Sequence, residues 1–195
     1  MKLPTLLALA LGHLVVASPT KRNQVDGAAP KIDDPNFISR VMDAHWYWRR
    51  IHCAQDLTWD PALAQAAFDS VNACTEHPQH DRGGSNLSSM GPAPGHYDEW
   101  LRAAREMVQG WHEEELKYPY DNPTWDTAWG HFTQVVWRNT SHLGCAMAHC
   151  GDVEFPARLY CFYESPGNVL SDGMTEFKAN VWPMVCKDPD QKRPH

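Results

Sequence analysis

The chain has 195 residues, a formal net charge of −7 at neutral pH and six cysteines. Its length suits a single domain with a buried core. The negative charge argues against a nucleic-acid-binding surface, because phosphate backbones are bound by clustered lysine and arginine.

Residues 1–17 have the layout of a secretory signal peptide. Lys2 is followed by an apolar run from Leu3 to Val16, and the small residues Ala17 and Ser18 come next. This run is shorter than the roughly 20 residues of a membrane-spanning helix, and no later stretch of the sequence is apolar enough to span. We therefore expect a secreted, extracellular protein, in which the six cysteines form disulfides.

The segment after the signal peptide is polar. Residues 18–32 are interpreted as a candidate pro-segment or linker, and Lys21-Arg22 is a candidate dibasic cleavage site within it. The folded domain is expected to span residues 33–186, and the polar residues 187–195 are expected to form a disordered tail.

Two helices are predicted from the same start signal. In Asp34-Pro35 and Asp60-Pro61 the aspartate is placed as the N-cap and the proline at the first helical position, where its missing N–H costs nothing. Apolar residues at helical spacing follow each start. The second helix is rich in alanine and should let another element approach closely.

The stretch from His77 to His96 contains glycines and prolines that are predicted to block any long regular element. Polar loops of this kind often carry function, so its histidines are candidate site residues. A third helix is then predicted, with Asp98 as its N-cap and an apolar face that ends near Trp111. Glu114 should border that face, where a carboxylate needs a partner.

Aromatic side chains crowd the loop between Tyr118 and Trp129. Exposed aromatic area is costly in a soluble monomer unless something covers it. Two alternatives follow: Tyr118, Tyr120 and Trp125 close over an apolar molecule, or these rings fold back onto the core of the domain.

Two antiparallel strands are predicted beyond this loop, from Leu143 to Cys150 and from Arg158 to Tyr163. Cys145 and Cys150 lie five residues apart on one strand, roughly 16 Å at about 3.3 Å per residue, and cannot pair with each other. Opposed positions on neighbouring antiparallel strands are about 4.5–5.5 Å apart, which suits a Cys145–Cys161 disulfide. The pattern between Phe132 and Trp137 fits either a strand or a short helix.

The residues Gly130–Thr140, GHFTQVVWRNT, resemble the first signature of the CAP superfamily, which comprises cysteine-rich secretory proteins, antigen 5 and pathogenesis-related 1 proteins. The phrase Trp59–Ala67 resembles another hallmark of this family, and His45 and Arg49 resemble its H-x-x-x-R pair, for which a structural role is expected. The resemblance implies an α+β fold, a three-layer α-β-α sandwich with a small antiparallel sheet between helices, stapled by disulfides. It implies a short helix at the signature.

The remaining disulfides are implied by the same resemblance. It pairs Cys74 with Cys150, and Cys53–Cys186 is then left by elimination.

Family members carry two histidines and two glutamates in a cleft, and the histidine pair can bind a divalent metal. The resemblance places the histidines at His80 and His131 and one glutamate at Glu114, while Ser85 replaces the other. His77 is a competing choice for the first histidine. Because the missing glutamate weakens the second shell of ligands, we expect at most a weakly bound zinc ion.

The function implied by the resemblance is binding rather than catalysis. Tyr118, Tyr120 and Trp125 fit the aromatic-x-aromatic-x-x-x-x-aromatic loop of sterol-binding fungal members. We interpret the chain as a secreted, non-enzymatic carrier of a sterol or fatty acid, with a role in defence or virulence. The alternatives are a metal-dependent hydrolase that uses His80, Glu114 and His131, and an effector that recognises a protein receptor without a lipid.

Two sequons are present, at Asn86 and at Asn139. Asn86 is the preferred glycosylation site, because its loop is predicted to be polar and glycine-rich, whereas Asn139 adjoins the packed signature.

Overall fold

The computed structural model describes residues 27–186, so the predictions for the signal peptide 1–17, for most of the segment 18–32 and for the tail 187–195 lie outside the described residues. Within residues 27–186, no helix is both long enough and apolar enough to cross a membrane. The elements in chain order are α1 (Pro35–Ile51), β1 (Thr58–Trp59), α2 (Pro61–Val71), β2 (Ser85–Met90), α3 (Tyr97–Glu113), η1 (Glu114–Lys117), α4 (Gly130–Val136), β3 (His142–His149), β4 (Ala157–Glu164), η2 (Asp172–Met174) and α5 (Thr175–Asn180).

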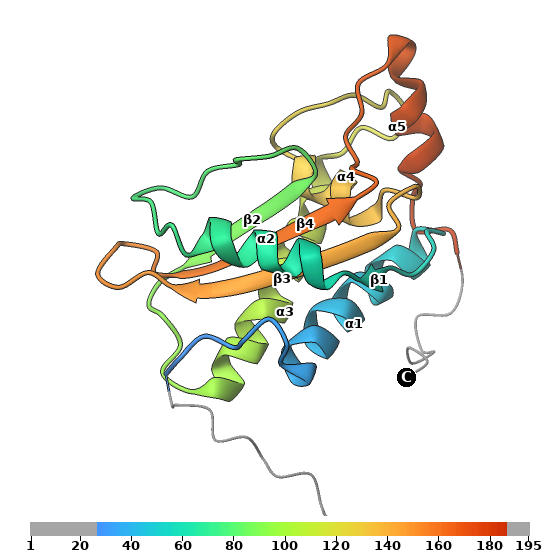
Figure 1. Ribbon diagram of the computed structural model, residues 1–195. Coiled ribbons are helices and arrows are strands. Elements are labelled where there is room, and N and C mark those ends of the chain that lie inside the picture. The colour runs from blue at the N-terminus through green and yellow to red at the C-terminus, as the bar shows by residue number, and fades with distance from the viewer. Residues whose placement is uncertain (1–26, 187–195) are drawn as a thin grey trace, which may run out of the picture.

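The strands form one sheet in the order β1-β3-β4-β2, in which β1 is parallel to β3 and the other pairs are antiparallel. Helix α2 covers one face of the sheet, and α1, α3 and α4 lie on the other side (Figure 1). This is the predicted three-layer α+β sandwich.

The central strands β3 and β4 are buried on both faces, and their side chains alternate between two cores. On β4, Leu159, Cys161 and Tyr163 join the core under α1, α3 and α4. The residues between them, Tyr160 and Phe162, join the smaller core under α2. The two layers of helices are therefore held by the same two strands.

Helix α2 approaches β3 very closely, as its alanine content predicts. A Cβ atom placed on Gly144 would lie 2.1 Å from the backbone nitrogen of Ala64. Ala64 and Ala67 are buried at this contact. Only a small residue fits on either side, so Gly144 sets how closely α2 can approach.

The N-caps predicted at the two Asp-Pro pairs are confirmed. The Asp34 side chain accepts hydrogen bonds from the backbone N–H groups of Asn36 and Phe37, at 2.9 and 3.4 Å. Asp60 does the same at the start of α2, at 2.7 and 3.2 Å. These aspartates satisfy N–H groups that have no partner within the helix.

His45 and Arg49 are fully buried and have the structural role expected of them. Arg49 donates to the backbone carbonyls of Val135, Trp137 and Thr140, which fastens α1 to the end of α4. His45 contacts the Tyr163 hydroxyl on β4 at 2.8 Å. Neither side chain is available for chemistry at a surface.

All three predicted disulfides are present. Cys145–Cys161 joins β3 to β4 at opposed positions of the ladder. Cys74–Cys150 ties the end of α2 to the end of β3. Cys53–Cys186 fastens the C-terminal segment to the end of α1.

The stretch from His77 to His96 was predicted to hold no long regular element, and the loop expected there is interrupted by a short strand at residues 85–90. They form β2, which pairs with β4 along its whole length. The serines of this segment give no alternation of apolar and polar residues, so the strand is specified by the hydrogen-bonding edge of β4 rather than by its own pattern.

The start of the third helix is also corrected. Helix α3 begins at Tyr97, with His96 rather than Asp98 at the cap position. The Glu99 carboxylate accepts from the backbone N–H groups of Gly95 and His96, at 2.9 and 3.2 Å. A glutamate in the first turn reaching back to the chain before the helix replaces the expected aspartate cap.

Candidate functional site

Glu114 and His131 form the centre of the candidate site. The Oε1 atom of Glu114 lies 2.7 Å from Nδ1 of His131, and its Oε2 atom accepts from the backbone N–H groups of His131 and Phe132, at 3.0 and 3.2 Å. A carboxylate only accepts, so Nδ1 of His131 carries the proton, and in the neutral ring Nε2 presents its lone pair. Glu114 therefore both caps the start of α4 and orients the imidazole.

His80 is brought to His131 by the loop before β2. The two rings are stacked, with centroids 5.9 Å apart and planes at 23°. Nδ1 of His80 lies 2.8 Å from the Ser85 hydroxyl, which itself donates to the Arg82 carbonyl. The hydroxyl proton is thus used, so Nδ1 of His80 is the donor and its Nε2 atom is left with the lone pair.

Ser85 therefore does for His80 what Glu114 does for His131: each fixes Nδ1 as the protonated nitrogen. Burial lowers the pKa of His80, and the neighbouring His131 lowers it further. His80, rather than its competitor His77, is the ring that meets His131.

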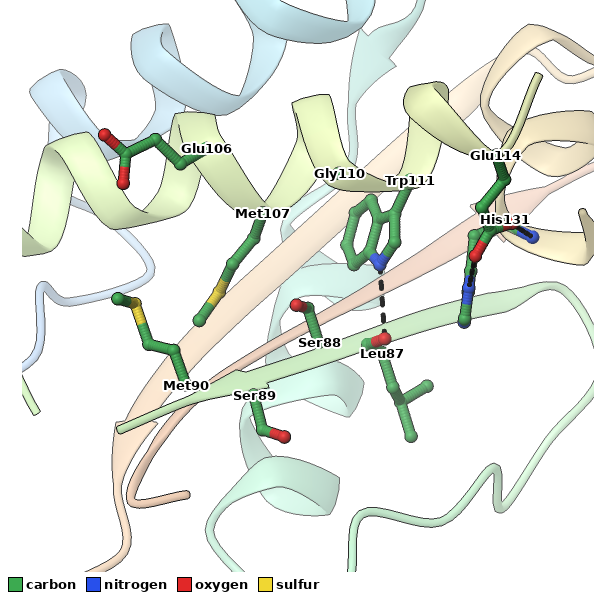
Figure 2. Close-up of a pocket in the computed structure, with 10 residues that line it drawn as sticks. All are labelled: Leu87, Ser88, Ser89, Met90, Glu106, Met107, Gly110, Trp111, Glu114 and His131. Carbon is green, nitrogen blue, oxygen red and sulfur yellow. Dashed lines mark hydrogen bonds and ion pairs between the residues drawn. The ribbon is translucent and has the colours of Figure 1, made fainter. Parts of the chain in front are cut away.

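A groove of about 390 Å³ runs between α3 and β2 and ends at Glu114 and His131. Figure 2 shows Met90 and Met107 at one end, and Glu114 and His131 at the other. Trp111 lines the middle of the groove, and its indole N–H donates to the Leu87 carbonyl at 3.2 Å. The groove thus combines an apolar wall with a titratable group at each end, Glu106 near the methionines and the Glu114–His131 pair at the other end.

Tyr118, Tyr120 and Trp125, the three residues of the predicted lipid-binding loop, do not lie together at the surface. The Tyr118 side chain is buried, and its ring packs against those of Tyr120 and Phe132, with centroids 4.9 and 5.6 Å apart. Burial raises the pKa of Tyr118 to about 12. The Tyr120 hydroxyl donates to Glu115 at 2.7 Å. These two rings follow the alternative in which the loop folds back onto the core.

Trp125 differs from its two partners, because 39% of it is exposed. Its ring lies over Gly130, where a Cβ atom would come within 2.6 Å of the indole. The carbonyl of the same glycine accepts from the Asn168 amide at 2.9 Å. Val169 and Leu170, the two residues that follow Asn168 in the chain, are exposed as Trp125 is. We call these three residues the Trp125 corner.

The preference for Asn86 as the glycosylation site is not supported by the structure. Asn86 is 1% exposed within β2, and its amide donates to the His131 carbonyl at 3.0 Å. A glycan on that nitrogen would have no space. Asn139, in contrast, is exposed.

A second group of titratable residues, His52, His112 and Glu115, was not predicted. Burial, together with the neighbouring His52, lowers the pKa of His112 to about 3. The three residues come from the ends of α1 and α3 and from η1, so no short motif contains them. Only the pairing of the helices reveals the group.

The comparison with protein families gives one match: the model of the cysteine-rich secretory protein family, CAP, matches residues 42–163. Among curated proteins, secreted protein RBT4 of Candida albicans is 33% identical over 147 residues, which are 71% of this chain and 37% of that protein. Protein PRY2 of Saccharomyces cerevisiae is 32% identical over 154 residues, 77% of this chain and 42% of that protein. The chain thus spans about two fifths of the length of these fungal relatives.

A plant relative is covered more fully. Pathogenesis-related protein 1B of Nicotiana tabacum is 33% identical over 141 residues, which are 69% of this chain and 79% of that protein. Among solved structures, BmVAL-1 superposes with a TM-score of 0.59 at 21% identity, covering 73% of this chain and 84% of that one. At such identity the structure supports the fold alone. From the family match and these relatives, the chain belongs to the cysteine-rich secretory protein, or CAP, family.

Proposed function

We propose that this protein is secreted and binds an apolar small molecule, a sterol or a fatty acid, at the Trp125 corner. The observation that carries the proposal is the exposure of Trp125, whose ring lies over the buried Gly130, together with that of Val169 and Leu170, which follow the asparagine that donates to the Gly130 carbonyl. Apolar side chains gathered at one place on a soluble protein mark a binding surface.

The supporting layer beneath the corner is rigid. Tyr118 and Phe132 pack edge to face below the loop, and Trp129 donates through its indole N–H to the Thr124 carbonyl at 2.9 Å. The loop therefore presents Trp125 from a fixed base, which reduces the entropy lost when a ligand is bound.

The groove between α3 and β2 is a second place for the same ligand class. Met90, Met107 and Trp111 offer an apolar wall, and His131 at its end offers a polar group for a hydroxyl or a carboxylate. Mostly apolar pockets with a few convergent polar groups are the usual form of small-molecule sites.

We also propose that His80 and His131 bind a divalent metal weakly, with zinc as the candidate. Their Nε2 lone pairs are free because Ser85 and Glu114 hold the protons on Nδ1. A metal needs such oriented, neutral imidazoles. NaASP2, a protein with this fold, has been crystallised with Zn²⁺, and its 16% identity supports only the likeness of fold.

A binding protein is proposed in preference to a hydrolase because of the position of Glu114. A catalytic zinc takes three protein ligands and keeps one open position. Both carboxylate oxygens of Glu114 are occupied by His131 and by the N–H groups at the start of α4. Glu114 is therefore placed to orient a ligand of the metal rather than to be one.

The proposal is tested by extracting the protein secreted by its native host and analysing the extract by mass spectrometry. A sterol or fatty acid at a fixed ratio to protein is the expected result. A control extraction of Trp125→Ala, secreted by the same cells, should contain less of that lipid. An extract with no lipid above the level in protein-free medium contradicts the proposal.

A further inference from the structure

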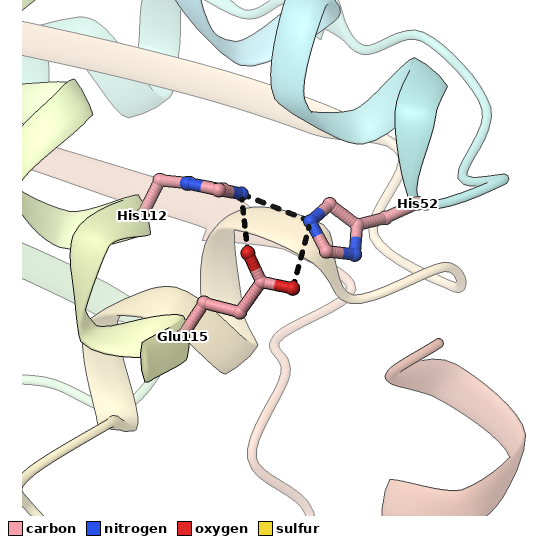
Figure 3. Close-up of side chains that lie close together, drawn as sticks. All are labelled: His52, His112 and Glu115. Atoms are coloured by element: carbon pink, nitrogen blue, oxygen red, sulfur yellow. Dashed lines mark hydrogen bonds and ion pairs between the residues drawn. The ribbon is translucent and has the colours of Figure 1, made fainter. Parts of the chain in front are cut away.

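His52, His112 and Glu115 meet where α1 and α3 end and η1 begins (Figure 3). The two Nε2 atoms are 2.9 Å apart. Glu115 places Oε1 3.8 Å from Nε2 of His52 and Oε2 3.4 Å from Nε2 of His112. One atom from each side chain thus lies within 4.8 Å of the other two, close enough for all three to bind one ion.

This group is enclosed by aromatic rings. The His112 ring is stacked on Trp48, with centroids 3.7 Å apart, and the edge of Phe132 meets both imidazoles, at 5.4 and 5.6 Å. Both histidines are buried, and the Glu115 side chain is 13% exposed. Imidazoles and a carboxylate in such surroundings are costly unless each has a partner.

The protons on these rings can be assigned from their neighbours. His52 donates from Nδ1 to the Trp182 carbonyl at 2.6 Å, so in the neutral ring its Nε2 atom has only a lone pair. The contact between the two rings therefore takes its single proton from Nε2 of His112. The lone pair of His52 and the carboxylate of Glu115 are both acceptors, and the single proton on Nε2 of His112 is the donor that faces them. Acceptors therefore outnumber donors between these three side chains.

A cation at the centre would satisfy all three groups at once. His112 would then carry its proton on Nδ1, the tautomer of a neutral imidazole that binds through Nε2. No proton has to leave the protein for this exchange.

Outer contacts already hold two of the three ligand residues. The Trp182 carbonyl orients His52, and the Tyr120 hydroxyl donates to Glu115 at 2.7 Å. The Cys53–Cys186 disulfide lies beside His52 and fastens the segment that carries Trp182. Second-shell hydrogen bonds of this kind are typical of protein metal sites.

We propose that His52, His112 and Glu115 form a binding site for a divalent transition-metal cation of the Zn²⁺ type, separate from the His80–His131 pair. Two imidazole nitrogens and one carboxylate oxygen suit zinc and its neighbours, whereas calcium and magnesium prefer oxygen ligands alone. The site supplies three ligands and leaves a fourth position for water.

The test isolates the buried group by working in the full secreted chain with His131→Ala, which breaks the other histidine pair. Titration calorimetry with Zn²⁺ at neutral pH is expected to give one ion per chain, and Zn²⁺ should raise the Tm. Adding His112→Phe, which keeps an aromatic ring against Trp48, should weaken binding more than about tenfold. Adding Glu113→Gln, an exposed neighbour, should leave the affinity unchanged.

If circular dichroism shows that the His112→Phe protein does not fold, Glu115→Gln in the same background replaces it, because it keeps the shape and removes the charge. The proposal is overturned if the His131→Ala protein binds no Zn²⁺. It is equally overturned if the folded His112→Phe or Glu115→Gln protein binds Zn²⁺ as tightly as its parent. Neither result depends on whether the protein binds a lipid.

Discussion

Glu114 and Glu115 are consecutive in the chain, yet their carboxylates serve two different histidine groups. Glu114 binds His131 at 2.7 Å, and Glu115 lies 3.4 Å from His112. Consecutive side chains of a helical turn point about 100° apart, so the two carboxylates reach different neighbours. One short segment thereby connects the candidate cleft to the buried group.

This arrangement predicts that Glu114→Gln destabilises the fold. The carboxylate accepts two backbone N–H groups at the start of α4 as well as the His131 ring, and an amide cannot replace all three charged contacts. We expect a loss of about 1–3 kcal/mol in the free energy of unfolding, measured by urea denaturation. Glu113→Gln, one residue earlier and exposed, should change it by less than about 0.5 kcal/mol. Equal losses for the two variants would refute the role given to Glu114.

Tyr118, at the start of the loop 118–129, is predicted to contribute to stability as a buried core residue. Tyr118→Ala removes a buried ring from the core and should cost about 3–5 kcal/mol of stability. Leu116→Ala, at a residue that is 92% exposed, should cost almost nothing. Thermal denaturation of both variants checks this, and an unchanged Tm for Tyr118→Ala would contradict the packing.

Glycosylation is predicted at Asn139 alone. Asn139 is exposed, whereas the Asn86 amide is buried and bonded to the His131 carbonyl. Glycopeptide mass spectrometry of the natively secreted protein should find a glycan on Asn139 and an unmodified Asn86. A glycan on Asn86 in folded protein would show that β2 is not placed as described.

Acid is predicted to destabilise the protein through its buried histidines. Burial lowers the pKa of His45 to about 4, although its hydrogen bond with the Val41 carbonyl acts in the opposite direction. In the unfolded chain the pKa is about 6.5, so between these values unfolding takes up a proton. The stabilisation is fully present above pH 6.5 and is lost as the pH falls towards 4, by at most about 1.4 kcal/mol per pH unit for this histidine.

Urea denaturation from pH 8 to pH 4 measures this loss. His45→Asn, whose side chain does not titrate, should be less stable at pH 7 but should show a shallower decline on acidification. The same slope in both proteins would rule out His45 as a source of the acid sensitivity.

Local signals in the sequence predicted much of the fold. Asp34 and Asp60 cap their helices through contacts within three residues, so the local sequence is enough to predict both caps. Cys145 and Cys161 follow from strand geometry, because opposed positions on an antiparallel pair lie within disulfide reach. The remaining two pairs came from the family resemblance.

Non-local features could not be predicted in this way. The segment Ser85–Met90 has no strand pattern of its own and becomes β2 by pairing with β4. The same pairing buries Asn86, which is why a loop-based argument chose the wrong sequon. His52 and His112 lie sixty residues apart, and only the packing of α1 against α3 places them 2.9 Å from each other.

The central claim, that the Trp125 corner binds an apolar ligand, is tested most directly by measuring sterol and fatty-acid affinity on two matched variants. Trp125→Ala removes the exposed ring of the corner, and Phe155→Ala removes a similarly exposed ring from the turn between β3 and β4 (Figure 1). We predict that Trp125→Ala weakens binding about tenfold or more with nearly unchanged Tm, and that Phe155→Ala binds like the wild type. Unchanged affinity together with a lowered Tm for Trp125→Ala would contradict the claim.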